Sequence, residues 1–219
     1  MRTGDIIATR GTSLTLASEL VRRRYDRIAR IYDTGEALME LRARAWRRAA
    51  WAAVAGAHDI LEVGVGTGKS IPFYPPAARV TALDISPRML DRARQRARRA
   101  GRSVALDLAD AQAMPYAAGA FDAVVSIFVF CSVPDPIQAL AEVKRVLRPG
   151  GRLIMVEHVL SRRRILRAFL CALDPWTERL WGAHVARQTD ETVRAAGFAT
   201  VAVTDLALDV VKRIDAALP

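Results

Sequence analysis

The feature that most constrains the fold is an alternation of short apolar runs with helical segments between residues 59 and 159. The apolar runs cover residues 59–64, 79–84, 103–110, 121–129 and 151–159. They are largely continuous rather than alternating with polar residues, which is typical of strands whose two sheet faces are both covered by helices. Strands that alternate with helices in this way form an open parallel sheet with right-handed crossovers.

The helical segments carry recognisable start and stop signals. After the second run, Ser86 is a predicted N-cap, Pro87 takes the first helical position, and the helix ends at Gly101. A further helix over residues 135–148 ends at a Pro-Gly-Gly turn. A helix over 190–197 is followed by two more strands, or by a strand and a helix. The first 55 residues are predicted to be helices that precede the sheet.

A glycine-rich turn, residues 64–70 (GVGTGKS), follows the first strand and resembles three kinds of nucleotide-binding loop. A phosphate-binding P-loop needs a glycine at position 63, where the chain has Val63. A dinucleotide loop needs a third glycine at position 69, where the chain has Lys69. Both alternatives therefore fail by one residue, and we expect Lys69 and Ser70 to begin the first crossover helix.

The arrangement that fits is the carboxylate Glu62 followed by glycines at every second position, Gly64, Gly66 and Gly68. Asp84 then ends the second strand, twenty residues after Gly64, and Asp110 ends the third. Parallel strands bring these groups to one sheet edge, and glycines let the backbone approach a ligand there. A carboxylate at the end of the second strand can accept hydrogen bonds from both ribose hydroxyls of an adenosine ligand that lacks a 2′-phosphate. The sequence therefore predicts an adenosine-type ligand.

Five segments in order, LEVGVGTG, VTALDISPRML, ADAQAMPY, FDAVVSIFVF and EVKRVLRPGGRL, resemble the class I S-adenosylmethionine-dependent methyltransferases over about residues 58–157. The resemblance implies an α/β fold with a Rossmann-like, seven-stranded, mostly parallel sheet and helices on both faces. It implies residues 1–55 as a helical, membrane-facing cap, residues 56–219 as the methyltransferase domain, and S-adenosylmethionine as cofactor. The implied cofactor-binding residues are Tyr25, Glu62, Gly64, Gly66, Gly68, Asp84, Ile85, Met89, Asp110, Ala111, Ile127 and Phe128.

The resemblance also implies individual roles. Glu62 and the glycines would hold the methionine end, Asp84 the ribose diol, and Asp110 the adenine amino group. The segment YDRIARIYD, residues 25–33, resembles the ubiquinone and phospholipid methyltransferase branch, in which it lies over the cofactor. Tyr25 would then contact the methionine carboxylate. The alternative is that Tyr25 and Tyr32 only pack on the sheet.

The methyl acceptor is suggested by the segments outside the cofactor motifs. CSVPDPIQALAEV and DPWTERLWGAHVARQTDETVRAAGF resemble the bacterial phosphatidylethanolamine N-methyltransferases and related thiol methyltransferases, although Ala183 stands where cysteine is familiar. The expected acceptor is phosphatidylethanolamine or its monomethyl form; the alternatives are a thiol, a quinone precursor or another small molecule. A nucleic-acid binder or RNA methylase is a rival that the apolar SIFVFCSV segment disfavours. The candidate catalytic residues are Tyr25, His158 and His184, and the candidate bases are His158, His184 and Glu157.

The net charge of +10 comes almost entirely from arginine. Arginines surround apolar stripes in residues 13–32 and 161–176, which favours contact with an anionic membrane surface. The alternative is that these helices cover the sheet and their arginines face water. We expect a cytoplasmic protein, peripheral on the inner face of a membrane, without a signal peptide, a disulfide framework or a metal site. The sequence does not determine the oligomeric state.

Overall fold

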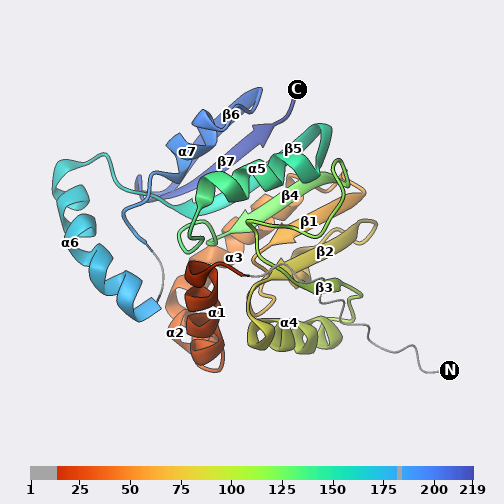
Figure 1. Ribbon diagram of the computed structural model, residues 1–219, viewed down its shortest axis with the longest axis horizontal. Coiled ribbons are helices and arrows are strands. Elements are labelled where there is room, and N and C mark those ends of the chain that lie inside the picture. The colour runs from red at the N-terminus through yellow and green to blue at the C-terminus, as the bar shows by residue number, and fades with distance from the viewer. Residues whose placement is uncertain (1–13, 182–183) are drawn as a thin grey trace.

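The computed structural model describes residues 14–181 and 184–219 and centres on one seven-stranded sheet (Figure 1). The strand order is β3-β2-β1-β4-β5-β7-β6. Strands β1 to β5 pair in parallel, and β7 pairs antiparallel with both β5 and β6. The strands are β1 (Asp59–Val63), β2 (Arg79–Asp84), β3 (Ala105–Leu108), β4 (Phe121–Ile127), β5 (Leu147–His158), β6 (Thr200–Ala207) and β7 (Val211–Ala217).

Helices cover both faces of this sheet. They are α1 (Leu16–Ile28), α2 (Tyr32–Gly35), α3 (Ala37–Ala52), α4 (Pro87–Arg99), α5 (Pro136–Val146), α6 (Arg164–Trp181) and α7 (Thr189–Ala195). Leu140 of α5 and Val193 of α7 belong to the core on one face, whereas Trp51 of α3 and Leu90 of α4 belong to the core on the other. The predicted α/β architecture is confirmed, and residues 198–218 form the two-stranded alternative.

Local signals placed two of the crossover helices correctly. The Ser86 hydroxyl accepts a hydrogen bond from the Met89 N–H at 3.1 Å, and Pro87 follows at the first position of α4. Asp135 caps α5 in the same manner, because one carboxylate oxygen accepts from the N–H groups of Ile137 and Gln138. Such caps satisfy backbone donors that have no partner within the helix.

The first crossover differs from the prediction. Lys69 and Ser70 do not begin an α-helix; they precede a single 3₁₀ turn, η1 (Ile71–Phe73). Pro72, Pro75 and Pro76 lie within or just after this turn, and a proline in a helix interior removes a backbone donor and clashes with the preceding turn. The sequence of this crossover therefore cannot continue as a helix.

Helices α1 and α2 lie at the carboxyl edge of the sheet, and α3 runs from there across the face on which Trp51 packs; we call residues 16–52 the cap. In Figure 1, α6 lies at the periphery of the molecule, away from the sheet layers. Within the described ranges, no helix combines the length and the apolar character needed to cross a bilayer.

Candidate functional site

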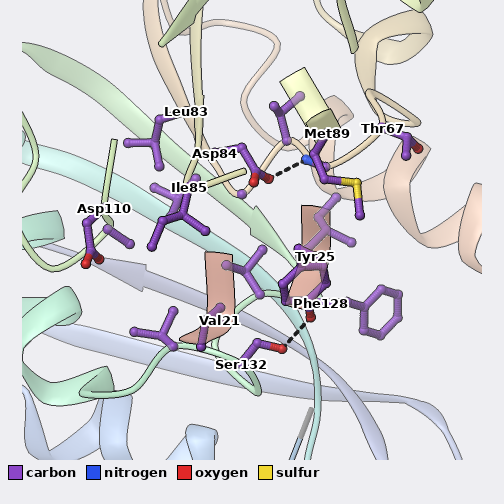
Figure 2. A pocket seen from close by; sticks show the side chains of 18 of the residues that line it. Val21, Tyr25, Thr67, Leu83, Asp84, Ile85, Met89, Asp110, Phe128 and Ser132 are labelled. Carbon is purple, nitrogen blue, oxygen red and sulfur yellow. Dashed lines mark hydrogen bonds between the residues drawn. The ribbon is translucent and has the colours of Figure 1, made fainter. Parts of the chain in front are cut away.

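A pocket lies at the carboxyl edge of the sheet, between the ends of β1, β2 and β4 and the cap (Figure 2). Of the twelve predicted cofactor residues, ten line it: Tyr25, Gly64, Gly66, Asp84, Ile85, Met89, Asp110, Ala111, Ile127 and Phe128. Topology explains this gathering, since all parallel strands end at the same edge and their loops meet there. Glu62 and Gly68 are the two that do not line the pocket.

The glycine turn places its backbone against both the pocket and the neighbouring loop. Gly64 has a φ of +71°, and a Cβ there would lie 2.4 Å from a methyl carbon of Val129. Any side chain at Gly64 would therefore push the loop after β4 away. Gly66 also has a positive φ, and its N–H donates to Asp84 Oδ2 at 2.8 Å. The turn and the end of β2 are thus fixed to each other by a direct hydrogen bond.

Asp84 is the buried carboxylate of this edge. Its Oδ1 accepts from the Ser86 N–H at 2.9 Å, in addition to the Gly66 contact. Burial raises the pKa of Asp84 to about 6, although the hydrogen bonds from the backbone N–H groups of Ser86 and Gly66 act in the opposite direction. The backbone holds the carboxylate rigidly at the pocket wall, where a ligand diol could donate to it.

Glu62 lies beneath the glycine turn rather than in the pocket. The Tyr74 hydroxyl donates to Glu62 Oε2, and the Tyr74 ring packs on Trp51 with a centroid separation of 4.2 Å. Burial raises the pKa of Glu62 to about 7, despite hydrogen bonds from Tyr74 and Ser70. In this position Glu62 supports the turn from below. Gly68 also packs inward, since a Cβ there would meet Ala93 of α4.

Asp110 marks the other end of the pocket. Its carboxylate accepts from the Ser18 hydroxyl at 2.5 Å and from the Gln112 side-chain amide at 3.0 Å. Ile85 supplies apolar surface between Asp84 and Asp110, and Met89 lines the pocket on the other side of Asp84, as Figure 2 shows. The pocket therefore runs from one carboxylate to another along an apolar wall.

Helix α1 lies over the pocket and contributes Val21 and Tyr25 to its lining. The Tyr25 hydroxyl and the Ser132 hydroxyl are 2.6 Å apart, and this hydrogen bond is drawn in Figure 2. Tyr32 begins the next helix, yet its ring centroid lies 6.2 Å from that of Tyr25. Val21 and Ser132 were not predicted as site residues, and only the fold brings them to the pocket. Ser132 lies in the SIFVFCSV segment, the one signal that pointed towards it.

Ion pairs fasten the cap to the domain. Asp33 accepts from the Thr67 hydroxyl at 2.6 Å and from Arg92 and Arg96 at 2.9 and 2.8 Å. Lys69 Nζ lies 2.8 Å from Glu36 Oε2 and also lines the pocket. The lysine of the glycine-rich turn thus binds carboxylates of the cap.

Asp26 of α1 fastens the cap at a second point. Its Oδ1 accepts from the Ser86 hydroxyl at 2.6 Å, at the start of α4. The same Ser86 caps that helix, so α1 and α4 share one hydrogen-bonding residue. The cap is therefore held at both the glycine turn and the end of β2.

The loop after β4 forms the wall opposite the glycine turn. Phe128 has a φ of +59°, a left-handed conformation that is uncommon for a bulky residue. Glu157 of β5 stabilises the loop, because its Oε1 accepts from the N–H groups of Val129 and Phe130 at 3.0 and 3.1 Å. Arg187 donates to the carbonyls of Phe130 and Val133 from the other side. Burial raises the pKa of Glu157 to about 7, despite these N–H donors.

The two predicted catalytic histidines do not line the pocket. His158 at the end of β5 is partly buried, and burial lowers its pKa against the effect of a hydrogen bond with the Val185 backbone. His184 Nδ1 lies 3.1 Å from Asp174 Oδ2, and its backbone N–H donates to the Cys131 carbonyl. Both histidines therefore lie behind the pocket wall. Ala183 lies outside the described residues. Among the residues that are described, no three ligating side chains come together as a metal site.

Comparison with known proteins agrees with this geometry. Residues 61–155 match the family model described as a methyltransferase domain. A demethylmenaquinone methyltransferase of Deinococcus radiodurans is 40% identical over 140 residues, which cover 61% of this chain and 55% of the relative. A phosphatidylethanolamine N-methyltransferase of Cereibacter sphaeroides is 37% identical over 130 residues, which cover 58% of this chain and 64% of the relative. The chain thus spans less than two thirds of the length of either relative.

A solved structure extends the comparison to nearly the whole fold. It is described as an S-adenosylmethionine-dependent methyltransferase, possibly a histamine N-methyltransferase, from Thermotoga maritima. It superposes with a TM-score of 0.69 at 20% identity, over 90% of this chain and 99% of that one. The fold is therefore the Rossmann-like methyltransferase fold. Residues 61–155 match a methyltransferase domain, and the two curated relatives are methyltransferases.

Proposed function

We propose that this protein transfers the methyl group of S-adenosylmethionine to the headgroup amine of phosphatidylethanolamine or of its monomethyl form. The observation that carries the proposal is the pocket itself. Carboxylates stand along one side of it, at Asp84 and Asp110, and an apolar aromatic wall of Phe128, Val129 and Tyr25 closes the other side. The first side suits the nucleoside part of the cofactor. The second side suits the methyl acceptor as it approaches the reactive methyl group.

The residues of the pocket fit S-adenosylmethionine. The buried Asp84 carboxylate can accept from a ribose diol, while Ile85 and Met89 offer apolar surface to an adenine ring. A Cβ at Gly66 would meet nothing within 4 Å, so the backbone of the turn is open to a ligand. When bound, S-adenosylmethionine would supply an electrophilic methyl group on a sulfonium. An acceptor would attack this methyl carbon in line, and S-adenosylhomocysteine would leave as a neutral thioether.

The protein's part in such a displacement is alignment and exclusion of water. Helix α1 covers the pocket, and its Tyr25 hydroxyl is held by Ser132. Burial raises the pKa of Tyr25, so the phenol stays neutral and can orient a ligand by a hydrogen bond. Neither histidine faces the pocket, so we propose that an amine acceptor arrives already neutral rather than losing its proton to either histidine.

A quinone precursor is the second candidate acceptor, and a small thiol or another small molecule is the third. The demethylmenaquinone methyltransferase of Deinococcus radiodurans is as similar to this chain as the phospholipid enzyme is, which favours the quinone alternative equally. The apolar wall formed by Phe128, Val133 and Pro134 suits a flat aromatic acceptor as well as a lipid headgroup. A methylase of RNA is the remaining rival, and this wall offers a flipped base few hydrogen-bonding groups.

Two measurements test the proposal in sequence. Calorimetry with S-adenosylhomocysteine, ATP and NAD should show binding of the first alone; tight ATP or NAD binding would contradict the cofactor assignment. Methyl transfer from labelled cofactor is then measured against phosphatidylethanolamine vesicles, a demethylated quinol, small thiols and RNA. Label in the phospholipid supports the proposal. Label found only in the quinol, a thiol or RNA would refute phosphatidylethanolamine as the acceptor. It would still support methyl transfer from S-adenosylmethionine.

A further inference from the structure

Helix α6 exposes an apolar stripe that no other part of the described structure covers. Ile165 is 89% exposed, Phe169 61% and Trp176 65%. These residues stand four and seven positions apart, so they lie on one side of the helix, with Leu173 between them at 36% exposure. Leu170 is buried on the side that faces the protein. The helix therefore has two apolar sides: the side with Leu170 packs against the protein, and the side with Ile165 and Phe169 is exposed.

Arginines gather at the beginning of this stripe. Arg163, Arg164 and Arg167 are all exposed, and Arg163 and Arg164 border a shallow surface hollow with Ile165, Leu166 and Phe169. Among the described residues, Arg164 and Arg167 make no ion pair. Guanidinium groups beside apolar side chains match a surface that presents phosphate groups above hydrocarbon.

We propose that α6 docks on an anionic phospholipid membrane, with Ile165, Phe169 and Trp176 inserted and the arginines of its first turn at the phosphates. Charge identifies the partner: each arginine near an anionic bilayer contributes about 1 kcal/mol of binding, and tryptophan is enriched at headgroup depth. This inference goes beyond the proposed function, since docking is measured without methyl transfer and without any particular acceptor.

The cap offers a second exposed apolar surface, which serves as the comparison for α6. Leu38 and Leu41 of α3 are 83% and 77% exposed. They flank Glu40, and Glu36 caps the same helix. Both carboxylates pair with Lys69 or Arg47 of the protein itself. The first turn of α6 contains no carboxylate, and its arginines make no ion pair with a described residue.

The docking helix is joined to the pocket wall through its second half. Asp174 Oδ1 accepts from the Ala186 N–H at 2.9 Å, and its other oxygen contacts His184. The backbone of His184 then donates to the carbonyl of Cys131, which precedes the pocket residue Ser132. A membrane-bound α6 would therefore hold this side of the pocket near the bilayer.

The experiment is sedimentation of the full chain with vesicles of phosphatidylcholine alone or mixed with phosphatidylglycerol, at low and raised salt. The wild-type chain should bind the anionic vesicles, and bind them less at high salt. Arg163→Gln/Arg164→Gln/Arg167→Gln should weaken that binding about a hundredfold, and Ile165→Asp/Phe169→Asp more than tenfold. Leu38→Asp/Leu41→Asp is the matched control and should bind within about threefold of wild type.

Circular dichroism and S-adenosylhomocysteine affinity establish that each variant is folded. The inference is overturned if the wild-type chain does not bind anionic vesicles at low salt. It is also overturned if the α3 pair, and not the α6 pair, abolishes binding. A dimer that the α6 substitutions dissociate, or RNA binding that they abolish while vesicle binding persists, would assign the stripe to another partner and contradict the proposal.

Discussion

Helices α1 and α6 both carry arginines around apolar side chains, but the molecule uses them in opposite ways. On α1, Val21 and Tyr25 line the pocket, while Leu16 and Leu20 of the same helix are 80% and 58% exposed. Its Arg22 and Arg23 bond to Glu19 of the same helix, at 2.6 and 2.7 Å. On α6, Phe169 is exposed, and the first turn of the helix contains no carboxylate that could pair with its arginines.

The difference shows that an arginine-rich amphipathic helix is defined by its neighbours. Glu19 and Asp26 of α1 pair with Arg22 and Arg23, and Asp26 also connects the helix to α4. Once paired in this manner, α1 serves as a cover for the site. Arg164 and Arg167 of α6 make no such pair with a described residue. The predictions that follow test this division between an inward-facing and an outward-facing helix.

The largest loss of cofactor affinity is expected for a substitution of Asp84, in the pocket that α1 covers. Asp84→Ala removes an acceptor for two ligand hydroxyls and the anchor of the Gly66 N–H. Hydrogen bonds to a charged group contribute about 1.5–3 kcal/mol each, so S-adenosylhomocysteine affinity should fall by at least about a hundredfold. Calorimetry measures this, with Asp107→Ala on the neighbouring strand as control. An unchanged affinity would refute the ribose assignment.

A smaller loss is expected when the cap is unfastened. Asp33→Ala breaks the bonds to Thr67, Arg92 and Arg96, so the cap should close less often and cofactor affinity should fall about tenfold. Glu19→Ala is the control, because it breaks ion pairs only within α1 and should change affinity less than about twofold. Equal effects of the two substitutions would show that α1 is not a cover.

The Tyr25–Ser132 hydrogen bond joins α1 to the loop after β4. Tyr25→Phe and Ser132→Ala should each lower cofactor affinity about fivefold, the value of one hydrogen bond of about 1 kcal/mol. The double variant should be no weaker than either single variant, since both remove the same interaction. Strict additivity in this double-mutant cycle would mean that the bond contributes nothing to closure.

Glu157 supports that loop from the sheet and gives it a pH dependence. Its folded-state pKa of about 7 lies above the ordinary value of 4.5, so the folded protein binds the proton more tightly than the unfolded chain does. The free energy of unfolding should therefore decrease as pH rises from about 4.5 to 7 and level off above that range. In Glu157→Gln the fall in Tm across this range should be smaller by about 5–10 °C, as measured by calorimetry. Glu62 and Asp84 have raised pKa values as well, so part of the slope should remain.

The smallest effect is expected on the outward side. Ile165→Asp/Phe169→Asp changes only exposed side chains of α6, so S-adenosylhomocysteine affinity should stay within about twofold of wild type. A large loss would show that α6 acts on the cofactor site directly, and the contrast with α1 would fail. The same calorimetric titration provides the comparison.

Much of the fold and of the cofactor side of the pocket could be predicted from the sequence. The runs that became β1, β2 and β4 were located within two residues, and ten of twelve predicted cofactor residues reached the pocket. Strand ends are easy to read because the carboxyl edge of a parallel sheet gathers them without further information. Glu62 does not line the pocket, because its side chain accepts a hydrogen bond from the buried Tyr74 instead. Tyr74 belongs to the first crossover, which the sequence predicted to be a helix.

The acceptor side was harder to predict. Ser132 meets Tyr25 across more than a hundred residues of chain, and no local pattern relates the two. His158 and His184 are at the correct edge, but one is buried behind the loop and the other is held by Asp174. A strand-end position fixes where a backbone lies, whereas the direction of a side chain depends on what packs around it.

The amino-acid sequence by itself determined the sheet, the glycine turn and the carboxylates at its edge, because periodicity, capping and glycine conformations are local properties of the chain. The tertiary structure alone decided which arginine-rich helix turns inward and which stays exposed. That choice depends on partners distant in sequence: Ser86 and Ser132 receive α1, while only Leu170 is buried among the described side chains of α6. Long-range pairing, and not helix composition, separates a cover for the site from a surface for docking.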